Sequence, residues 1–168
     1  MSVGGPHIAQ INVFPGGVPK HPVPSARVTS LGLQGDAHRA LEHHGGPERA
    51  LCLFSLERIR ALQAEAHPIA LGSIGENLIL EGVDWNAVTP GRYLLLGEEV
   101  VVQVTRYTAP CGNIIGSFHN RDYSRVSAKR HPGDSRVCAR VLREGALTSG
   151  DVVQILTADE TLVLVGSR

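Results

Sequence analysis

The sequence predicts a mostly β protein, a barrel or sandwich with one or two short helices, in a single domain that covers residues 1–168. Nineteen glycines and ten prolines are spread along the 168 residues, with short runs of Val, Ile and Leu between them. This texture is typical of many short strands joined by turns. Hydrophobic residues make up 42% of the chain, which is enough for a core at this length.

One segment has the spacing of a helix. Ser55 can cap its N-terminus, because the hydroxyl can accept a hydrogen bond from a free backbone amide. Leu56, Ile59 and Leu62 follow at helical spacing. The pattern should fail by Pro68, so we expect one helix between Ser55 and Pro68.

The other regular elements are expected to be strands. They cover residues 8–14, 50–54, 78–80, 92–96, 99–105, 137–142 and 151–156. Residues 97–98 (Gly-Glu) predict a two-residue type II′ turn that makes a hairpin of the two strands beside it. Val100, Val102 and Val104 share one face of the second of these strands. By the same alternation Arg106 continues the valine face, and it would lie at the mouth of a barrel.

Charge and aromatic content limit the partners. Sixteen Lys and Arg residues balance sixteen Asp and Glu residues, so the formal net charge is zero, which argues against a general nucleic-acid binder. Three Tyr, three Phe and one Trp offer few rings for stacking on bases. Residues 1–19 lack the features of a signal peptide, and no apolar run is long enough to span a bilayer. We expect neither a nucleic-acid partner nor a membrane partner.

The cysteines are three in number and widely spaced, at Cys52, Cys111 and Cys138, with no CxxC pair. This pattern favours a reduced, cytoplasmic environment over a secreted disulfide framework. Cys52 and Cys138 fall inside expected strands, and we interpret both as inert structural thiols. Cys111 differs, because it follows a proline where a strand ends.

Cys111 is the strongest candidate for chemistry. A cysteine on such a loop can be reached by an external group, and Gly112 keeps the approach open. The nearby Arg106 would favour the thiolate, which is the form that binds metals or attacks sulfur. The alternative is a buried, inert cysteine, and spacing alone does not separate the two.

Two glycine-rich segments could surround a ligand. Residues 32–38 (GLQGDAH) and 43–49 (HHGGPER) contain glycines that allow the backbone to approach an anion or a cofactor ring. They also contain possible metal ligands, namely Asp36, His38, His43 and His44. Composition alone favours a plainer alternative, a loop whose His and Asp side chains bond to its own backbone.

Two further segments carry polar side chains. Residues 75–77 (GEN) predict a tight turn ahead of a strand, in which Glu76 and Asn77 hold a neighbouring loop by hydrogen bonds; an ordinary turn is the alternative. Residues 119–143 contain seven Lys and Arg residues and two Asp residues. Arg and Ser side chains there could donate to phosphate oxygens. A solvated basic face is an equal alternative.

Taken in order, these segments resemble the MOSC domain, named for the C-terminal domain of molybdenum-cofactor sulfurases. The resemblance rests on the patterns Gly35-Asp36-x-His38, His44-Gly45-Gly46-Pro47-x-Arg49, Gly75-Glu76-Asn77-Leu78 and Pro110-Cys111. It covers a core of about residues 8–156 and implies a MOSC-like β-barrel. One position departs from the pattern, because many relatives have an arginine where this chain has Thr108.

The resemblance implies a molybdenum cofactor (molybdopterin) or sulfur transfer, with Cys111 as the catalytic residue and molybdenum ligand. The residues expected to bind the cofactor are Asp36, His38, His44, Gly45, Gly46, Arg49, Glu76, Asn77, Arg106, Arg125, Lys129, Arg130 and Arg136. Among them, Arg125, Lys129, Arg130 and Arg136 are the candidates for holding the cofactor phosphate.

Three functions remain open. In the leading one, Cys111 binds the molybdenum, and the protein reduces a small N-oxygenated or N-hydroxylated compound with electrons from a donor protein. In the second, Cys111 carries a persulfide received from a sulfur-donor protein. In the third, the chain is a non-catalytic module that binds an anionic ligand or a protein partner, and Cys111 is dispensable.

Overall fold

The structure, a computed structural model, describes residues 4–14, 16, 18–36 and 46–166. The strands are β1 (His7–Val13), β2 (His21–Val23), β3 (Ser25–Thr29), β4 (Gly32–Leu33), β5 (Leu51–Ser55), β6 (Leu78–Glu81), β7 (Tyr93–Leu96), β8 (Val100–Tyr107), β9 (Val137–Arg143), β10 (Gly145–Thr148) and β11 (Val153–Leu156). The α-helices are α1 (Leu56–Ala64) and α2 (Ala158–Gly166). Short 3₁₀ helices are η1 (Pro47–Arg49), η2 (Trp85–Ala87), η3 (Gly112–Ser117), η4 (His119–Arg121) and η5 (Tyr123–Val126).

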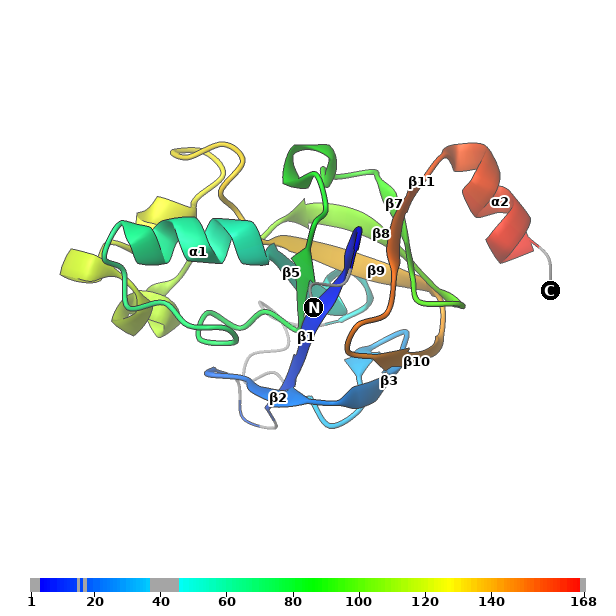
Figure 1. Cartoon of the computed structure of the whole chain (residues 1–168), viewed down its shortest axis with the longest axis horizontal. Helices are drawn as coiled ribbons and strands as arrows, with labels where there is room; N and C mark the ends of the chain where they lie inside the picture. Colours follow the sequence, from blue (N-terminus) through cyan, green and yellow to red (C-terminus); the bar gives the residue numbers. More distant parts are fainter. Residues whose placement is uncertain (1–3, 15, 17, 37–45, 167–168) are drawn as a thin grey trace.

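The strands form two sheets, which confirms the mostly β prediction (Figure 1). The larger sheet has eight strands in the order β11-β7-β8-β9-β5-β6-β1-β2, and the smaller has the order β10-β3-β4. β5 and β6 are parallel and are connected by α1, and the other neighbouring strands run antiparallel. Side chains that follow the ends of β5, β8 and β6 can therefore meet although they are far apart in sequence.

The expected closed barrel is wrong for the part of the chain that the structure describes. β1 and the end of the larger sheet near β11 meet at a single bridge, His7 to Val152. The amide of Ile8 donates to the Asp151 carbonyl at 2.8 Å nearby. Farther along β1, residues Ile11 to Val13 pair with β2 instead. The sheet thus curves until its margins touch, without a continuous closing ladder.

His7 lies in this seam and is 7% exposed. Its Nδ1 is 2.9 Å from the Gly5 carbonyl oxygen, and its Nε2 is 3.0 Å from Glu81 Oε2. The Arg60 guanidinium also contacts Glu81, at 3.2 Å. One side chain thereby connects the N-terminal segment to β6.

Helix α1 confirms the predicted helix and its cap. The Ser55 hydroxyl accepts a hydrogen bond from the Arg58 amide at 3.2 Å. Ile59 and Leu62 are buried against the sheets, with 0% and 1% exposure. The amphipathic face therefore belongs to the main core.

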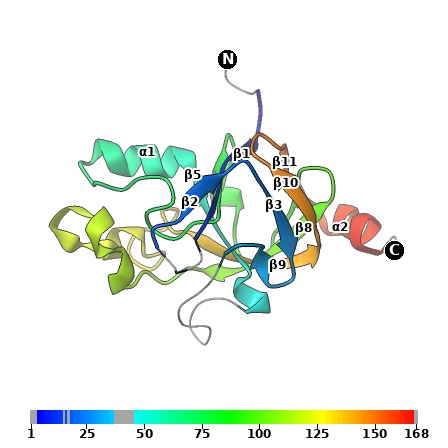
Figure 2. The same ribbon diagram turned by 90° about the horizontal axis from the view of Figure 1, so that it is seen from below.

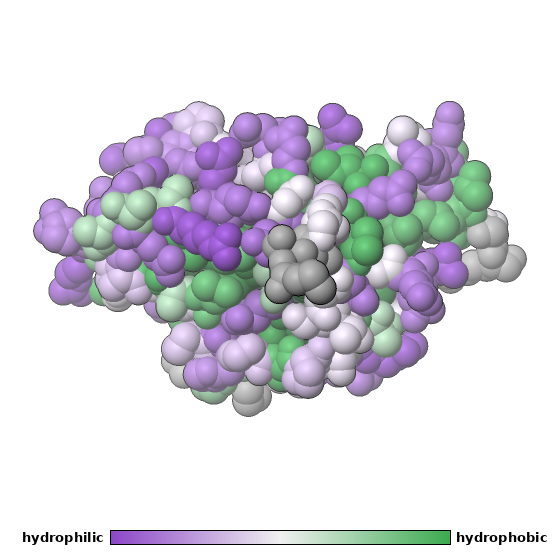
Figure 3. Space-filling view, viewed as in Figure 1, coloured by the Kyte–Doolittle hydropathy of each residue, from purple (hydrophilic) through white to green (hydrophobic). Residues whose placement is uncertain are grey.

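Helix α2 lies at the opposite side of the molecule from α1 and the 3₁₀ segment η3–η5 (Figures 1 and 2). Thr161 is its one buried residue within the described range, while Leu162 and Val163 are each 69% exposed. Figure 3 shows hydrophobic side chains at the surface over this end of the molecule. None of the described helices combines the length and apolar character that a membrane crossing requires.

The predicted hairpin is present, but its connection is longer than expected. Leu96 pairs with Val100, so residues 97–99 make a three-residue connection rather than a two-residue II′ turn. Gly97 adopts φ +65°, and a Cβ there would lie 2.8 Å from the Asp151 carboxylate. Packing against Asp151, rather than the local turn preference alone, therefore shapes this connection.

Candidate functional site

Cys111 lies on the loop that leaves β8 and begins η3. The residue is half-buried and is not a member of the main hydrophobic core. Its carbonyl accepts a hydrogen bond from the Ile114 amide at 3.2 Å. Upstream, the Thr108 amide donates to the Arg136 carbonyl at 2.9 Å. The loop is thus fixed on both sides of Cys111.

Arg106 does not continue the valine face of β8, so that prediction is wrong. The pairing shifts between Val104, which lies opposite Ala139, and Arg106, which lies opposite Cys138. Thr105 is the extra residue of this bulge, and such an insertion reverses the alternation of side chains. Val104 remains in the core, whereas Arg106 is exposed on the other face.

A row of side chains crosses three strands on that other face. Cys52 of β5 lies opposite Cys138 of β9, and Cys138 lies opposite Arg106 of β8. The Thr108 hydroxyl is 3.3 Å from the Cys138 sulfur and 3.9 Å from the Cys52 sulfur. Burial raises the pKa of the Cys52 thiol to about 12, with a smaller opposing effect of the Arg136 charge. This pKa keeps the Cys52 thiol protonated, as expected for the structural thiol that the sequence suggested, and makes it a poor nucleophile by itself.

Asp36 is buried in an ion pair with Lys20, whose Nζ is 2.5 Å from Asp36 Oδ1. The Phe14 amide donates to the same oxygen at 3.0 Å, and the Asn77 side chain donates to Oδ2 at 2.9 Å. Both carboxylate oxygens therefore accept hydrogen bonds inside the protein. The structure gives Asp36 an anchoring role at the end of residues 18–36, and its predicted contact with a cofactor stays a prediction.

Asn77 connects this ion pair to β5. Its side-chain oxygen accepts a hydrogen bond from the Cys52 backbone amide at 2.9 Å. The backbone amide of Asn77 donates to the Cys52 carbonyl at 2.8 Å. The side-chain nitrogen reaches Asp36, as described above. This is the hydrogen-bonding role that the sequence suggested for Asn77. The sequence contained no sign that Lys20, in a proline-rich segment, would be buried beside it.

Glu76 and Arg136 are buried polar residues on either side of the turn at Ile74, with 0% and 5% exposure. Glu76 Oε1 accepts from the Ile74 amide at 3.2 Å, and Arg136 donates to the Ile74 carbonyl at 2.5 Å. Glu76 Oε2 and Arg136 Nε have no hydrogen-bond partner among the described residues. Burial raises the Glu76 pKa to about 7, against the lowering effects of backbone hydrogen bonds and the Arg136 charge.

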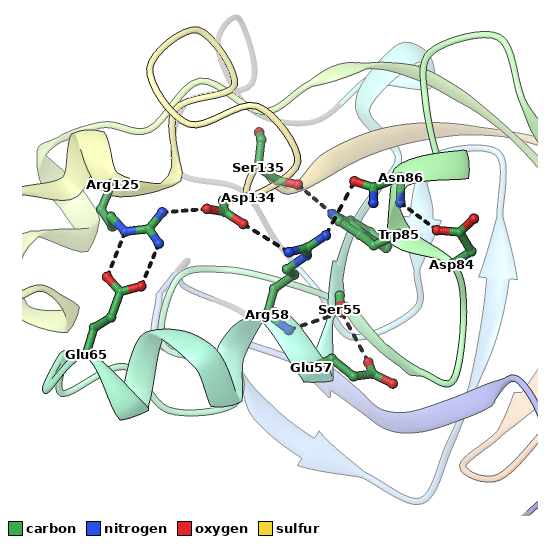
Figure 4. A network of polar contacts seen from close by, with 10 residues as sticks. All are labelled: Ser55, Glu57, Arg58, Glu65, Asp84, Trp85, Asn86, Arg125, Asp134 and Ser135. Carbon is green, nitrogen blue, oxygen red and sulfur yellow. Dashed lines mark hydrogen bonds and ion pairs between the residues drawn. The ribbon is translucent and has the colours of Figure 1, made fainter.

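The three arginines and one lysine proposed for a phosphate lie in different surroundings. Arg125 is engaged by two carboxylates: Nη2 is 2.7 Å from Glu65, and Nη1 is 2.6 Å from Asp134 (Figure 4). These bonds to Glu65 and Asp134 raise the Arg125 pKa. Arg136 is buried, so Lys129 and Arg130 are the exposed members of the set. The region is therefore not one uniform basic face.

The same carboxylates attach the segment η3–η5 to α1. Glu65 follows α1, and Asp134 also lies 3.5 Å from Arg58 of α1 (Figure 4). Nearby, the His119 amide donates to His67 Nδ1 at 3.0 Å. Charge pairs and a ring hydrogen bond together hold the segment that follows Cys111.

Part of the glycine-rich region is described. His38, His44 and Gly45 lie outside the described residues. Gly46 adopts φ +82° directly before η1, and Arg49 is half-buried within it. The predicted cofactor contacts of all five residues stay predictions.

Two clefts are lined by residues other than Cys111. One of about 440 Å³ is lined by His7, Ile8, Ala9, Leu56, Arg60, Gln63, Leu71, Glu81, Ser149 and Gly150. Another of about 250 Å³ lies beside β8 and β9, and is lined by Glu48, Gly91, Gln103, Val104, Thr105 and Arg140. Across residues 4–14, 16, 18–36 and 46–166 no three His, Cys, Asp or Glu side chains gather as a metal site.

Three known proteins resemble this chain in sequence or in fold. The chain is 29% identical over 146 residues to YflK of Bacillus subtilis, covering 86% of this chain and 65% of YflK. It is also 29% identical over 133 residues to a Gibberella moniliformis protein named reductase, covering 76% of this chain and 23% of that protein. The crystal structure of YiiM from Geobacillus stearothermophilus superposes with a TM-score of 0.71 at 24% identity, covering 90% of this chain and 75% of that one.

The chain thus spans less than two thirds of the length of these two sequence relatives. The likeness to YiiM concerns the fold. The model of the MOSC domain matches residues 40–154, which include Cys111, Glu76 and the strands β5 and β9 that carry Cys52 and Cys138. The chain therefore belongs to the MOSC domain family.

Proposed function

We propose that this protein binds a molybdenum-pterin cofactor through Cys111 and reduces small N-oxygenated compounds. The observation that carries the proposal is that Cys111 is a half-buried residue on a loop fixed by the Thr108 and Ile114 amides. Membership of the MOSC family and a relative named reductase support the choice of chemistry.

The donor set fits a metal that arrives inside an organic cofactor. A metal bound by the protein alone would need several ligands, and no cluster of three is present among the described residues. A cofactor that brings its own ligands needs one more, and a thiolate is a soft ligand suited to molybdenum. When bound, the molybdenum would supply the two-electron redox chemistry.

The residues of the chain would bind the cofactor and orient it. The exposed Lys129 and Arg130 are the cations available to a cofactor phosphate. The exposed Arg106 lies on the face of the sheet opposite the core, five residues before Cys111. Electrons would come from a donor protein, and a reduced cytoplasmic setting would keep the Cys111 thiol available.

Metal analysis tests the proposal. Wild type, Cys111→Ala and Cys138→Ala are purified from cells that make the cofactor, and molybdenum and pterin are measured per chain. We expect both in wild type and in Cys138→Ala, and loss of both in Cys111→Ala. Equal metal in Cys111→Ala, or a Cys111 persulfide in metal-free wild type, would overturn it, and the latter would identify a sulfur carrier instead.

Activity is tested separately on an N-hydroxylated base with a chemical electron donor. Reduction by loaded wild type and by Cys138→Ala, but not by Cys111→Ala, is the expected result. A loaded wild type that leaves every N-oxygenated compound unchanged would refute the reductase half of the proposal while leaving the cofactor half intact.

A further inference from the structure

A second thiol site lies on the larger sheet, apart from Cys111. We propose that Cys52 and Cys138 form a redox-active pair, in which a peroxide joins the two sulfurs in a disulfide across β5 and β9. This inference does not depend on any cofactor at Cys111, because it rests on strand register and on the contacts of the two thiols.

The register places the two cysteines in the arrangement that a disulfide needs. They lie directly opposite each other in an antiparallel pair, so their side chains share one face. The Cys52 amide and carbonyl both bond to Asn77 on the β6 side, and therefore not to β9. Cys52 and Cys138 are consequently a non-hydrogen-bonded pair, whose Cα atoms are about 4.5 Å apart, within the range of about 4.4–6.8 Å that a disulfide spans.

The surroundings separate this pair from ordinary core thiols. Neither cysteine belongs to the main hydrophobic core, to which their neighbours Leu53 and Ala139 do belong. Cys52 is half-buried and Cys138 is 7% exposed. The pair therefore lies on the face of the sheet that Arg106 shares, and its limited exposure makes a peroxide, the smallest class of oxidant, the reagent that fits it.

The Thr108 hydroxyl favours reaction at Cys138 first. It is 3.3 Å from the Cys138 sulfur, where it can donate a hydrogen bond to the reacting sulfur, and 3.9 Å from the Cys52 sulfur. Because burial raises the pKa of Cys52 to about 12, Cys52 acts second, as the resolving thiol.

The chemistry balances with one peroxide. The Cys138 thiolate attacks a peroxide oxygen, the O–O bond breaks, and hydroxide leaves and is protonated to water, which gives a sulfenic acid. The Cys52 sulfur then attacks the Cys138 sulfur, the S–O bond breaks, and the departing hydroxide takes the Cys52 proton to form a second water. Two thiols lose two electrons, and the peroxide is reduced to two waters.

Oxidation would also reach the loop of Cys111. Thr108 contacts both sulfurs and lies three residues before Cys111. Bonding the sulfurs to each other removes both S–H groups, so the Thr108 hydroxyl can no longer accept a hydrogen bond from either thiol. Oxidation of Cys52 and Cys138 therefore changes the hydrogen bonding of Thr108, in the loop that carries Cys111.

Mass spectrometry tests the pair in the full-length Cys111→Ser variant, which leaves Cys52 and Cys138 as the two thiols. The folded protein is treated with hydrogen peroxide, unfolded and alkylated. We expect a loss of about 2 Da and no alkylation, reversed by dithiothreitol. Trypsin should release residues 50–58 joined to residues 137–140, since cleavage follows Arg49, Arg58, Arg136 and Arg140.

Matched variants make the result decisive. Cys111→Ser combined with Cys52→Ser should give a Cys138 sulfenic acid and no intramolecular link. Thr108→Val, in the Cys111→Ser background, should slow disulfide formation about tenfold by removing one hydrogen bond to the thiolate. If both thiols are alkylated after peroxide treatment that fully oxidises Cys111 in wild type, or if over-oxidised monomers form in place of the joined peptides, the proposal is wrong.

Discussion

Glu76 shows what a buried titratable side chain does to the molecule around it. Its carboxyl is completely buried, one oxygen accepts from the Ile74 amide, and the other has no partner among the described residues. Burial raises its pKa from 4.5 to about 7. Between these two values the folded chain holds a proton that the unfolded chain releases, so the free energy of unfolding falls as pH rises through that window.

We therefore expect Glu76→Gln to flatten the pH dependence of stability. The wild type should lose on the order of 3 kcal/mol between pH 5 and pH 8 from this group, and the variant should not. Urea unfolding at several pH values measures the difference. Glu98→Gln, at an exposed position in the β7–β8 connection, is the control, and parallel curves for wild type and Glu76→Gln would contradict the assignment.

The ion pair of Lys20 and Asp36 has side chains that are only 4% and 3% exposed. Asp36→Asn would leave the Lys20 charge buried without its counter-charge, which typically costs about 3–5 kcal/mol. Denaturant titration measures this loss. The exposed pair of Arg60 and Glu81 is the comparison, since Arg60→Ala should change stability by less than about 1 kcal/mol. Equal losses of stability in the two variants would show that burial does not make the Lys20–Asp36 pair more costly to break than an exposed pair.

At the scale of elements, the segment η3–η5 is held to α1 mainly by Arg125. Arg125→Met would remove its bonds to Glu65 and Asp134, and we expect the segment to open about tenfold more often. Hydrogen exchange at the Phe118 amide, which bonds to the Ile115 carbonyl, measures this opening. Lys129→Met is the control at an exposed position. Unchanged exchange in Arg125→Met would mean that apolar contacts alone hold the segment.

Elements were predictable from the sequence where their signals are local. The cap and the apolar spacing of α1 lie within one segment, and both strands of the β7–β8 hairpin were found. Helix α2 is absent from the prediction, although Thr157 and Glu160 at its start are a local helix signal. The Glu160 amide donates to the Thr157 hydroxyl at 3.1 Å, and the Thr157 amide donates to the Glu160 carboxylate at 3.2 Å, which is a capping box.

The features that could not be predicted depend on residues far apart in the chain. The bulge at Thr105 follows from pairing with β9 and reverses the side of Arg106. The Asp36 contacts require Lys20 and Asn77 to arrive from two other segments. The sequence predicted a role for Cys111 and for Asn77. The pairing of Cys52 with Cys138 becomes visible only when β5 and β9 are aligned.

At the scale of the whole molecule, the seam between β1 and β11 decides how the sheet is held in its curved form. The His7 ring uses two separate nitrogens to reach Gly5 and Glu81, whereas both N–H groups of a glutamine are on one nitrogen, so His7→Gln cannot keep both contacts in the same geometry. We expect faster hydrogen exchange at the Ile8 and Val153 amides, which bond across the seam. His21→Gln, at an exposed position, is the control. Identical exchange in wild type and His7→Gln would show that the backbone contacts are sufficient.

The way in which His7 is held ties three distant parts of the chain together. Its ring contacts the Gly5 carbonyl and the Glu81 carboxylate of β6, while its backbone forms the bridge to Val152. Because one residue joins positions 5, 81 and 152, the two ends of the curved sheet cannot separate without also loosening the segment that enters β1.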